Sequence, residues 1–461
     1  MTENLRNDGF STYFINKLHP RWENSTYRYS TTNMWNVNLS IGNVNNNNSY
    51  NRNFIVGSSE SILNIDEWFI AEKRFFKNKH NSYGAQRIHL HPFRVVKLVK
   101  RITKKTYKPR PGYCFPIFEP SPREIFAAFC EDRMVHHYVS PFISFIADCV
   151  HNDNGDVSHG NRCGHSAQTG AEQIRDYVLK CDPEKFSFVK IDIKSCFPSI
   201  NREKAWLFFE KMARTYYHES DLEEKLSICK ILILHDPVFG CVQLSDAKLW
   251  EKVPPRKRMK NSNPGCGLPI GNFYSQLIAN IFLAILDCAL KPYGVNPRFV
   301  DDKCNIIHKS KIKECLEVAN RTANEMGLEL HPDKIYIQPI YHGVNFCGRT
   351  IKGKRIYISS RILNRINYKI KIGDISKDSA IKMCSTVNSY LGLMKHCTER
   401  KNEKRIADKV LHKYGKWLYF TVKDGHFTCH VRKKYLSRVY RKSMFDHFNK
   451  IVNETWENYK R

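Results

Sequence analysis

The sequence has little that would place the chain in a membrane or outside the cell. No apolar run in its 461 residues approaches the length needed to cross a bilayer, and the opening MTENLRNDGF lacks the charged-then-apolar pattern of a secretory signal. No CxxC pair occurs among the 16 cysteines, which argues against a structural zinc module. We therefore expect a cytoplasmic protein with no membrane partner, in which most cysteines are small buried apolar residues.

Acidic side chains are scarce relative to basic ones, 45 against 74, which gives a net charge of +29. Residues 351–461 hold 27 of the basic side chains against nine acidic ones, and a second basic run, RVVKLVKRITKKTYKPR, spans 94–110. One such run is usually a solvated charged face. Two runs, interleaved with tyrosines and flanking a nearly neutral middle, favour a nucleic-acid partner bound through its phosphates.

The periodicity of apolar residues divides the chain into an irregular start, a mixed middle and a basic, mostly helical end from about Ser359. Residues 1–60 are polar, Asn-rich and weakly periodic, which is typical of a loop or an irregular appendage. Helical spacing predicts helices at 65–80, over 121–150 with Ser-Pro as N-cap and first turn, at 171–180, from 201, at 274–291 and at 311–327. Short β-branched and aromatic runs predict strands at 186–193, 334–340 and 343–351, and a β-hairpin over 298–308.

Three aspartates stand where these elements end. Asp192 closes the strand predicted at 186–193, and Asp301 and Asp302 occupy the tip of the predicted hairpin. Each feature alone is weak, because strand-terminal aspartates are often caps and paired aspartates in turns are usually solvated. On adjacent strands they can share two Mg²⁺ ions about 3.5–4 Å apart, which activate a hydroxyl and stabilise a leaving pyrophosphate. No GxSxG, Walker A loop or HExxH offers a rival chemistry, so the pattern predicts nucleotidyl transfer.

Five segments occur in the order and approximate spacing of the palm motifs of reverse transcriptases: FVKIDIKSCFPSI (188–200), GLPIGNFYSQLIANIFL (267–283), RFVDDKCNIIH (298–308), MGLELHPDKIYIQ (326–338) and GVNFCGRTI (343–351). EDRMVHHYVSPFI and SHGNRCGHSAQTG also resemble the upstream motifs of the bacterial enzymes. The resemblance implies an α/β (α+β) right-hand polymerase. Its parts would be an Asn-rich extension (1–60), fingers and N-terminal helices (61–185), a palm with an antiparallel sheet and helices (186–358) and a mostly helical basic thumb (359–461).

The resemblance also implies catalytic roles. Asp192, Asp301 and Asp302 match the metal-binding triad, with the Ile193 backbone carbonyl as a further ligand, for two Mg²⁺ ions that Mn²⁺ can replace. Lys334 matches the catalytic lysine that protonates the leaving pyrophosphate.

Further residues match motifs that bind the substrates. Those expected to contact the incoming nucleotide or template are Arg162, Lys194, Ser195, Cys196, Phe197, Ile270, Gly271, Asn272, Ser275 and Gln276. Among them, Phe197 matches the steric gate that excludes a ribose 2′-hydroxyl, and Arg162 the finger arginine that holds the triphosphate. The primer grip would be Gly343, Phe346, Cys347 and Gly348.

Some positions depart from the family pattern. Phe299 replaces the usual tyrosine, Cys163 and His165 stand where lysine is common, and Cys347 replaces a leucine. None of these changes removes a triad carboxylate, so we expect an active enzyme.

GLPIGN…SQ, with the preceding HDPVFGC…LWEKVPPRKRMKNSNPGC, looks most like the reverse transcriptases of diversity-generating retroelements, which copy a template-repeat RNA with errors at adenines. Ile270 stands where many relatives have glutamine, and an aliphatic side chain there loosens selection against mispairs, unless it merely packs. The implied partners are a template RNA, a DNA or RNA primer, dNTPs and a basic accessory variability protein on the basic surface. Two alternatives remain: an antiphage-defence reverse transcriptase that uses a non-coding RNA, and an inactive RNA-binding scaffold.

Residues 30–59, STTNMWNVNLSIGNVNNNNSYNRNFIVGSS, resemble the variable ends of proteins that such retroelements diversify. Asparagine codons begin with two adenines and end in a pyrimidine, so errors at adenine change the residue without creating a stop. One hypothesis is therefore that this segment is template-repeat sequence translated in frame. The other is an ordinary Asn-rich tail with no part in the chemistry.

Overall fold

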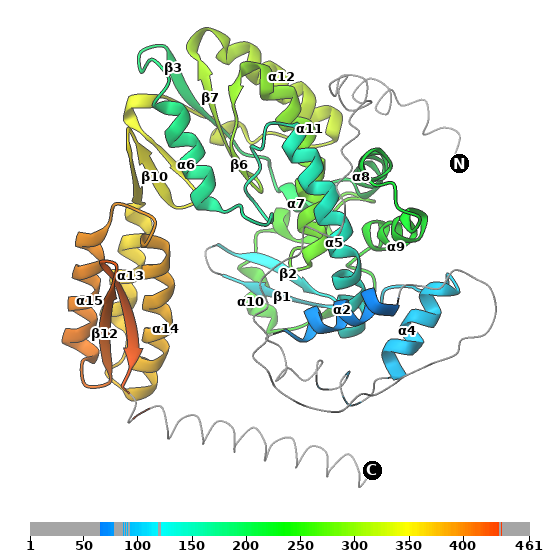
Figure 1. Ribbon diagram of the computed structural model, residues 1–461, viewed down its shortest axis with the longest axis horizontal. Helices are drawn as coiled ribbons and strands as arrows, with labels where there is room; N and C mark the ends of the chain where they lie inside the picture. The colour runs from blue at the N-terminus through cyan, green and yellow to red at the C-terminus, as the bar shows by residue number, and fades with distance from the viewer. Residues whose placement is uncertain are drawn as a thin grey trace. The chain divides into compact units, whose positions relative to one another are not determined.

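Two compact units, each built from separated stretches of the chain, make up the part that the structure describes (Figure 1). The computed structural model describes residues 65–77, 86, 88, 90, 93–118, 121–432 and 435, so the Asn-rich segment lies outside it. The first unit comprises the described residues up to Asp156 together with Ile193–Leu290 and Glu317–Leu330, and the second comprises Val157–Asp192, Lys291–Leu316 and the residues from His331. Both contain helices and strands, which confirms the mixed class predicted from the sequence.

The first unit is mostly helical. Its helices are α2 (Ile65–Phe76), α4 (Phe93–Thr103), α5 (Cys130–Asp153), α7 (Cys196–Ser199), α8 (Arg202–Tyr216), α9 (Leu222–Leu234), α10 (Ala247–Glu251) and α11 (Phe273–Leu290). Its strands are β1 (Tyr113–Ile117), β2 (Arg123–Ala127) and β4 (Val242–Gln243), and α12 (Ile312–Met326) begins in the second unit and ends in the first. α5 packs against α2, α8, α9 and α11 and is the centre of this unit.

Helix α11 is apolar on nearly every side. Contrary to the expectation from the sequence, Phe273–Tyr293 is long and apolar enough to cross a membrane, with a mean hydropathy of 1.6. Of that apolar window, however, 78% is buried inside the protein, where α11 packs against α5 and α8. A helix that is hydrophobic all round is one that the core surrounds, and this packing accounts for the composition.

The helix predicted from Ser121 is wrong in its first part. Arg123–Ala127 form strand β2, which pairs antiparallel with β1 in a three-stranded sheet of order β2-β1-β4. α5 begins only at Cys130, after Phe129 in a non-helical conformation. Burial alternates along REIFA with the period of two that marks a strand, and the Ser-Pro signal for a helix start concealed it.

The second unit carries the larger sheet. Its strands are β3 (Phe186–Ile191), β5 (Gly294–Val295), β6 (Arg298–Phe299), β7 (Asp302–His308), β8 (Tyr336–Pro339), β9 (Val344–Phe346), β10 (Arg349–Lys352), β11 (Arg355–Ile358), β12 (Leu418–Lys423) and β13 (His426–Val431). Its helices are α6 (Ala167–Val178), α13 (Ser360–Ile372), α14 (Lys377–Met394) and α15 (Arg400–Tyr414). The main sheet has the order β5-β7-β3-β8, with β6 paired to β7, which confirms the predicted strand at 186–193 and the hairpin over 298–308.

A second sheet and one helix close the core behind β3 and β7. β9, β10 and β11 form an antiparallel sheet, and α6 packs on β10 and β11. α6 begins with a capping box in which Ser166 and Thr169 satisfy each other's backbone amides. Buried residues from these elements form one cluster: Ala171, Ile174, Val178, Phe188, Cys304, Ile306, Ile340, Val344, Phe346, Ile351 and Ile356.

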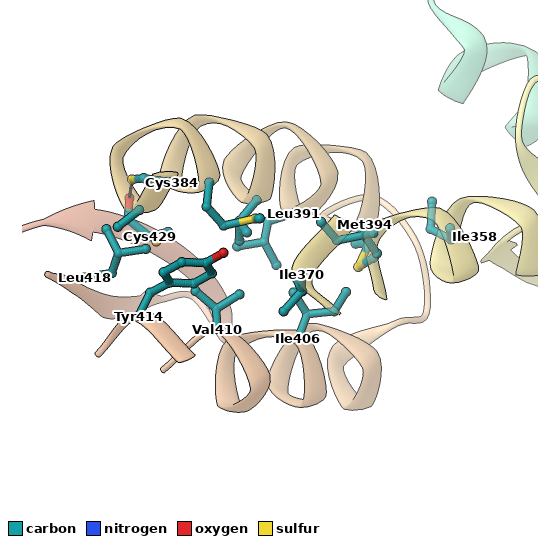
Figure 2. Packing of buried hydrophobic residues seen from close by; sticks show 14 residues of the cluster. Ile358, Ile370, Cys384, Leu391, Met394, Ile406, Val410, Tyr414, Leu418 and Cys429 are labelled. Atoms are coloured by element: carbon teal, nitrogen blue, oxygen red, sulfur yellow. Dashed lines mark hydrogen bonds between the residues drawn. The ribbon is translucent and has the colours of Figure 1, made fainter. Parts of the chain in front are cut away.

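The end of the described chain forms a separate hydrophobic cluster. Helices α13, α14 and α15 pack with the hairpin β12–β13, and Figure 2 shows the ring of Tyr414 within their apolar core. The helices match the prediction, whereas the hairpin was missed. Its turn is Asp424-Gly425, both with positive φ, and this dipeptide between apolar runs is a strong hairpin signal.

Gly373, after α13, lies so close to Tyr414 that an alanine Cβ would overlap the tyrosine hydroxyl. That hydroxyl is buried and has no hydrogen-bond partner among the described residues. We predict that Gly373→Ala lowers the free energy of unfolding by about 1–3 kcal/mol, because this core has no space for the added methyl. Tyr414→Phe should be neutral or stabilising by up to about 1 kcal/mol, since it removes an unsatisfied polar group.

In the double variant, Tyr414→Phe should recover part of the loss, which denaturant unfolding of the four proteins measures as a coupling energy. Gly392→Ala on α14, where nothing lies within 4 Å of the new Cβ, is the matched control. Additive effects in the double variant would contradict the packing described for Gly373.

Candidate active site

Asp192 directly follows β3, and Asp302 is the first residue of the neighbouring strand β7. β3 and β7 run antiparallel with Ile191 opposite Lys303, so continuing the register by one residue places Asp192 opposite Asp302. Directly opposed residues of an antiparallel pair project from the same face of the sheet, with Cβ atoms about 4.5–5.5 Å apart. Their side chains are 29% and 32% exposed, so both carboxylates can reach solvent.

Asp301 lies at the tip of the β6–β7 hairpin, in a two-residue turn with Val300. Val300 has a φ of 58°, in the left-handed region that β-branched residues rarely adopt. Two neighbours hold it there. Arg298, which is buried, donates to the Val300 carbonyl at 2.8 Å, and a Cβ on Gly160 would lie 2.8 Å from Val300 Cγ2. The strain, of order 1–3 kcal/mol, fixes the turn that presents Asp301.

Each of the two opposed carboxylates has a lysine partner. Lys334, in the short 3₁₀ helix Pro332–Lys334, forms an ion pair with Asp192, and Lys190 Nζ lies 2.7 Å from Asp302 Oδ1. Burial disfavours the charge of Lys190, but the attraction and hydrogen bond of Asp302 outweigh it, so the pKa of Lys190 is raised. These ammonium groups offset the repulsion between two like charges held side by side.

The turn between β9 and β10 contacts the second carboxylate oxygen of Asp302, the one that Lys190 does not contact. Cys347 and Gly348 form this turn, both with positive φ, and the Cys347 amide donates to Asp302 Oδ2 at 3.1 Å. The Cys347 thiol lies 3.6 Å from the same oxygen. Burial and the nearby Asp302 raise the pKa of this thiol, so it stays protonated and donates. Phe346 is fully buried, so it anchors the hairpin in the core.

The donor set of this site suits a hard divalent cation. Asp192, Asp302 and Asp301 supply carboxylate oxygens, which Mg²⁺ prefers to nitrogen or sulfur. Ile193 forms an isolated antiparallel bridge with Leu330. Its two hydrogen bonds run from the Lys194 amide to the Glu329 carbonyl and from the His331 amide to the Asp192 carbonyl, so the Ile193 carbonyl is not used in the bridge. Among the described residues, however, no group of three or more His, Cys, Asp or Glu side chains already lies at metal-binding distance. Triad coordination therefore stays a prediction.

Residues of the first unit predicted to contact the nucleotide lie on two short stretches. Lys194 pairs with Glu329 at 3.0 Å, and Ser195, with a φ of 49°, turns the chain into α7, which carries Cys196 and Phe197. Cys196 is buried, so only its backbone can reach a ligand in this conformation, whereas Phe197 is half-buried.

The second stretch precedes and opens α11. Ile270 is half-buried, and its carbonyl accepts from the Phe126 amide of β2 at 2.7 Å. Gly271 is exposed and Gln276 half-buried, while Asn272 is 7% exposed. Ser275 is completely buried in this conformation and presents no hydroxyl to solvent. Contacts of these residues with a nucleotide stay predictions.

Arg162 and Gly343, two predicted binding residues of the second unit, are engaged within it. The Arg162 side chain is buried and donates to the Ser158 carbonyl at 2.9 Å. Gly343 has a φ of 83° just before β9, and a Cβ there would lie 2.6 Å from the Ile351 carbonyl oxygen. Arg162 would have to turn outward to hold a triphosphate, so that role also stays a prediction.

Sequence reasoning missed Lys190, Arg298 and Gly160. Lys190 stands two residues before Asp192 on a strand and so on the same face, and this spacing was a usable signal. The other two carry no recognisable signal in the sequence: Arg298 acts through a contact with Val300 two residues on, and Gly160 acts through Val300 from a distant part of the chain.

We predict that Gly160→Ala displaces the Val300–Asp301 turn, because the new methyl overlaps Val300. The rate of the nucleotidyl transfer predicted from the sequence should fall about 10²-fold, the usual effect of a misplacement of about 1 Å. Thermal unfolding should register a loss of about 1–3 kcal/mol. Gly392→Ala again serves as control, and a Gly160→Ala protein that matches it in both measurements would show that the turn does not depend on Gly160.

No family model and no curated protein matches the chain. Among solved structures it is similar to telomerase from Candida albicans in complex with the TWJ fragment of telomeric RNA (13% identity, TM-score 0.40, covering 70% of this chain and 62% of that one). It is also similar to apo telomerase from Candida tropicalis (12% identity, TM-score 0.43, 69% and 60%). The chain thus spans about three fifths of the length of these relatives, and such a distant likeness assigns no activity.

Proposed function

We propose that the chain is an RNA-directed DNA polymerase that makes cDNA from a non-coding template RNA. The observation that carries this proposal is the opposition of Asp192 and Asp302 on adjacent strands, beside a strained turn that presents Asp301. A structural sheet gains nothing from two opposed carboxylates, which destabilise it unless a cation balances them. Hard oxygen ligands on a rigid sheet are what metal-assisted nucleotidyl transfer requires.

In this proposal the chain's own residues orient and neutralise the reacting groups. Asp192, Asp301 and Asp302 would hold Mg²⁺, which supplies Lewis-acid stabilisation of the developing negative charge. The Cys347 amide fixes the orientation of Asp302. Lys334, already beside Asp192, holds a proton near the site where pyrophosphate would leave. Phe197 would exclude a ribose 2′-hydroxyl.

Exposed basic faces on separate helices support a nucleic-acid partner. On α4, Leu98 and Ile102 are buried, whereas Lys97 and Lys100 are exposed. Lys104 and Lys105, which follow the helix, are exposed as well. On α15, the buried Ile406 and Val410 alternate with four exposed basic side chains, Lys401, Lys404, Arg405 and Lys409. Faces of this kind bind phosphates without base specificity. We assign them to the template RNA and the primer.

The finer proposal is a diversity-generating retroelement enzyme with errors at template adenines. The Ile270 carbonyl is bonded to β2, which restrains its backbone and therefore the place of its aliphatic side chain. A side chain with no polar group cannot form hydrogen bonds with the edge of a base pair. An antiphage-defence enzyme is the alternative, and the products of synthesis distinguish the two.

The polymerase proposal predicts cation-dependent incorporation of dNTPs on an RNA template with a DNA primer. Asp302→Asn should lower the rate about 10³-fold, because several kcal/mol of charge stabilisation are lost. Asp333→Asn, which changes a carboxylate that is 87% exposed next to Lys334, should leave the rate unchanged. Absence of incorporation by the wild-type chain with both Mg²⁺ and Mn²⁺ would leave only an RNA-binding scaffold.

For the finer proposal, we predict that Ile270→Gln lowers misincorporation opposite adenine severalfold, because the amide regains polar contacts that an alkyl group lacks. Sequencing of the cDNA measures the error rate at each template base, and the rates at uracil, guanine and cytosine are the internal control. Faithful or repetitive wild-type products would favour the defence enzyme. Equal adenine error rates in wild type and variant would show that Ile270 only packs.

A further inference from the structure

Lys190 joins Asp302 to the hairpin β9–β10. Its Nζ lies 2.7 Å from Asp302 Oδ1 and donates to the Asn345 carbonyl at 2.8 Å. The second carboxylate oxygen, Oδ2, accepts from the Cys347 amide. Both oxygens of Asp302 are therefore tied to one hairpin, the first through a lysine and the second directly.

The position of Lys190 on β3 makes this contact the natural one for its side chain. It pairs with Cys304 of β7, so Asp302 is its diagonal neighbour on the same face, within reach of a long side chain. The Lys190 side chain is only 23% exposed, so the pair is screened less than one on the surface. Exposed ion pairs contribute little, but this one also carries a hydrogen bond to the main chain.

The same ammonium balances the charge of the opposed aspartates. A divalent cation bound at Asp302 would repel Lys190, because both are positive and share one carboxylate. Lysine and cation thus compete for Asp302. The bond from Lys190 to Asn345 does not involve the carboxylate, so it can persist when the ion pair opens.

We propose that Lys190 is a positioning residue that holds Asp302 against the β9–β10 hairpin and gives way at Asp302 when a divalent cation binds there. This inference rests on the proposed function, because the cation belongs to the polymerase reaction. Through Lys190, the β9–β10 hairpin, which is predicted to grip the primer, responds to whether a divalent cation is bound at Asp302. A lysine paired with Asp302 alone would also compete with the cation, but its loss would leave the hairpin unchanged.

The first test measures Mn²⁺ binding to the full chain without nucleic acid or nucleotide, by electron paramagnetic resonance of the free ion. Lys190→Met removes the competing charge, so Mn²⁺ should bind about fivefold to tenfold more tightly than to wild type, at the lower end of usual coupling between ligands. Lys190→Arg keeps the charge and should bind as wild type does. Lys185→Met, at an exposed lysine just before β3, is the matched control. Affinity in Lys190→Met no tighter than in wild type would overturn the proposal.

The second test is amide hydrogen exchange over residues 343–352 in cation-free protein. Lys190→Met should exchange faster there than wild type and Lys185→Met, because one of the two ties from Asp302 to the hairpin is lost. Unchanged protection would overturn the positioning role. The proposed function fails if wild type and Asp302→Asn both fail to bind Mn²⁺ and wild type makes no DNA. Amide hydrogen exchange over residues 343–352 still decides the role of Lys190 in that case.

Discussion

The opposition of two like charges on β3 and β7 is the constraint on which the second unit depends. The register of these strands, continued one residue beyond Ile191, places Asp192 beside Asp302. The fold meets the resulting repulsion with two lysines from different elements, Lys190 and Lys334, and with the Cys347 amide. Partial exposure of both carboxylates keeps the face open to a ligand.

Rigidity around this site comes from the core that packs on the same face of β3 and β7. Arg298 donates to the Val300 carbonyl, and Gly160 leaves room for the Val300 side chain beside it. The β9–β10 hairpin is anchored by the buried Phe346, whose ring lies where a side chain on Gly170 would be. The carboxylates, the strained turn and the hairpin are thus held by one hydrophobic cluster, so small changes in that core should reach the site.

Short-range patterns in the sequence predicted the elements that carry the site. A short run of β-branched and aromatic residues predicted β3, and the apolar arms around Asp301 and Asp302 predicted the β6–β7 hairpin. The prediction failed at β2, where Ser121-Pro122 indicated the start of a helix while the alternating residues after it indicated a strand. The β12–β13 hairpin was not predicted, although its Asp424-Gly425 turn is a known hairpin signal.

Long-range contacts could not be predicted in this way. The bond from Lys190 to Asn345 joins residues 155 positions apart, and the inward turn of Arg162 depends on the fold around it. The complete burial of Ser275 follows from the packing of α11, which a motif does not encode. The motifs therefore predicted the three aspartates, whereas the ion pair of Lys190 with Asp302 was visible only in the tertiary structure.

The most direct test of the central claim is a titration of Mg²⁺ and Mn²⁺ in single-nucleotide incorporation on an RNA template with a DNA primer, for wild type and Asp192→Asn. The account predicts no product without a divalent cation, a rate that saturates as the cation is added, and near-complete loss of that rate in Asp192→Asn. Incorporation that needs no divalent cation, or that proceeds equally well in Asp192→Asn, would contradict it.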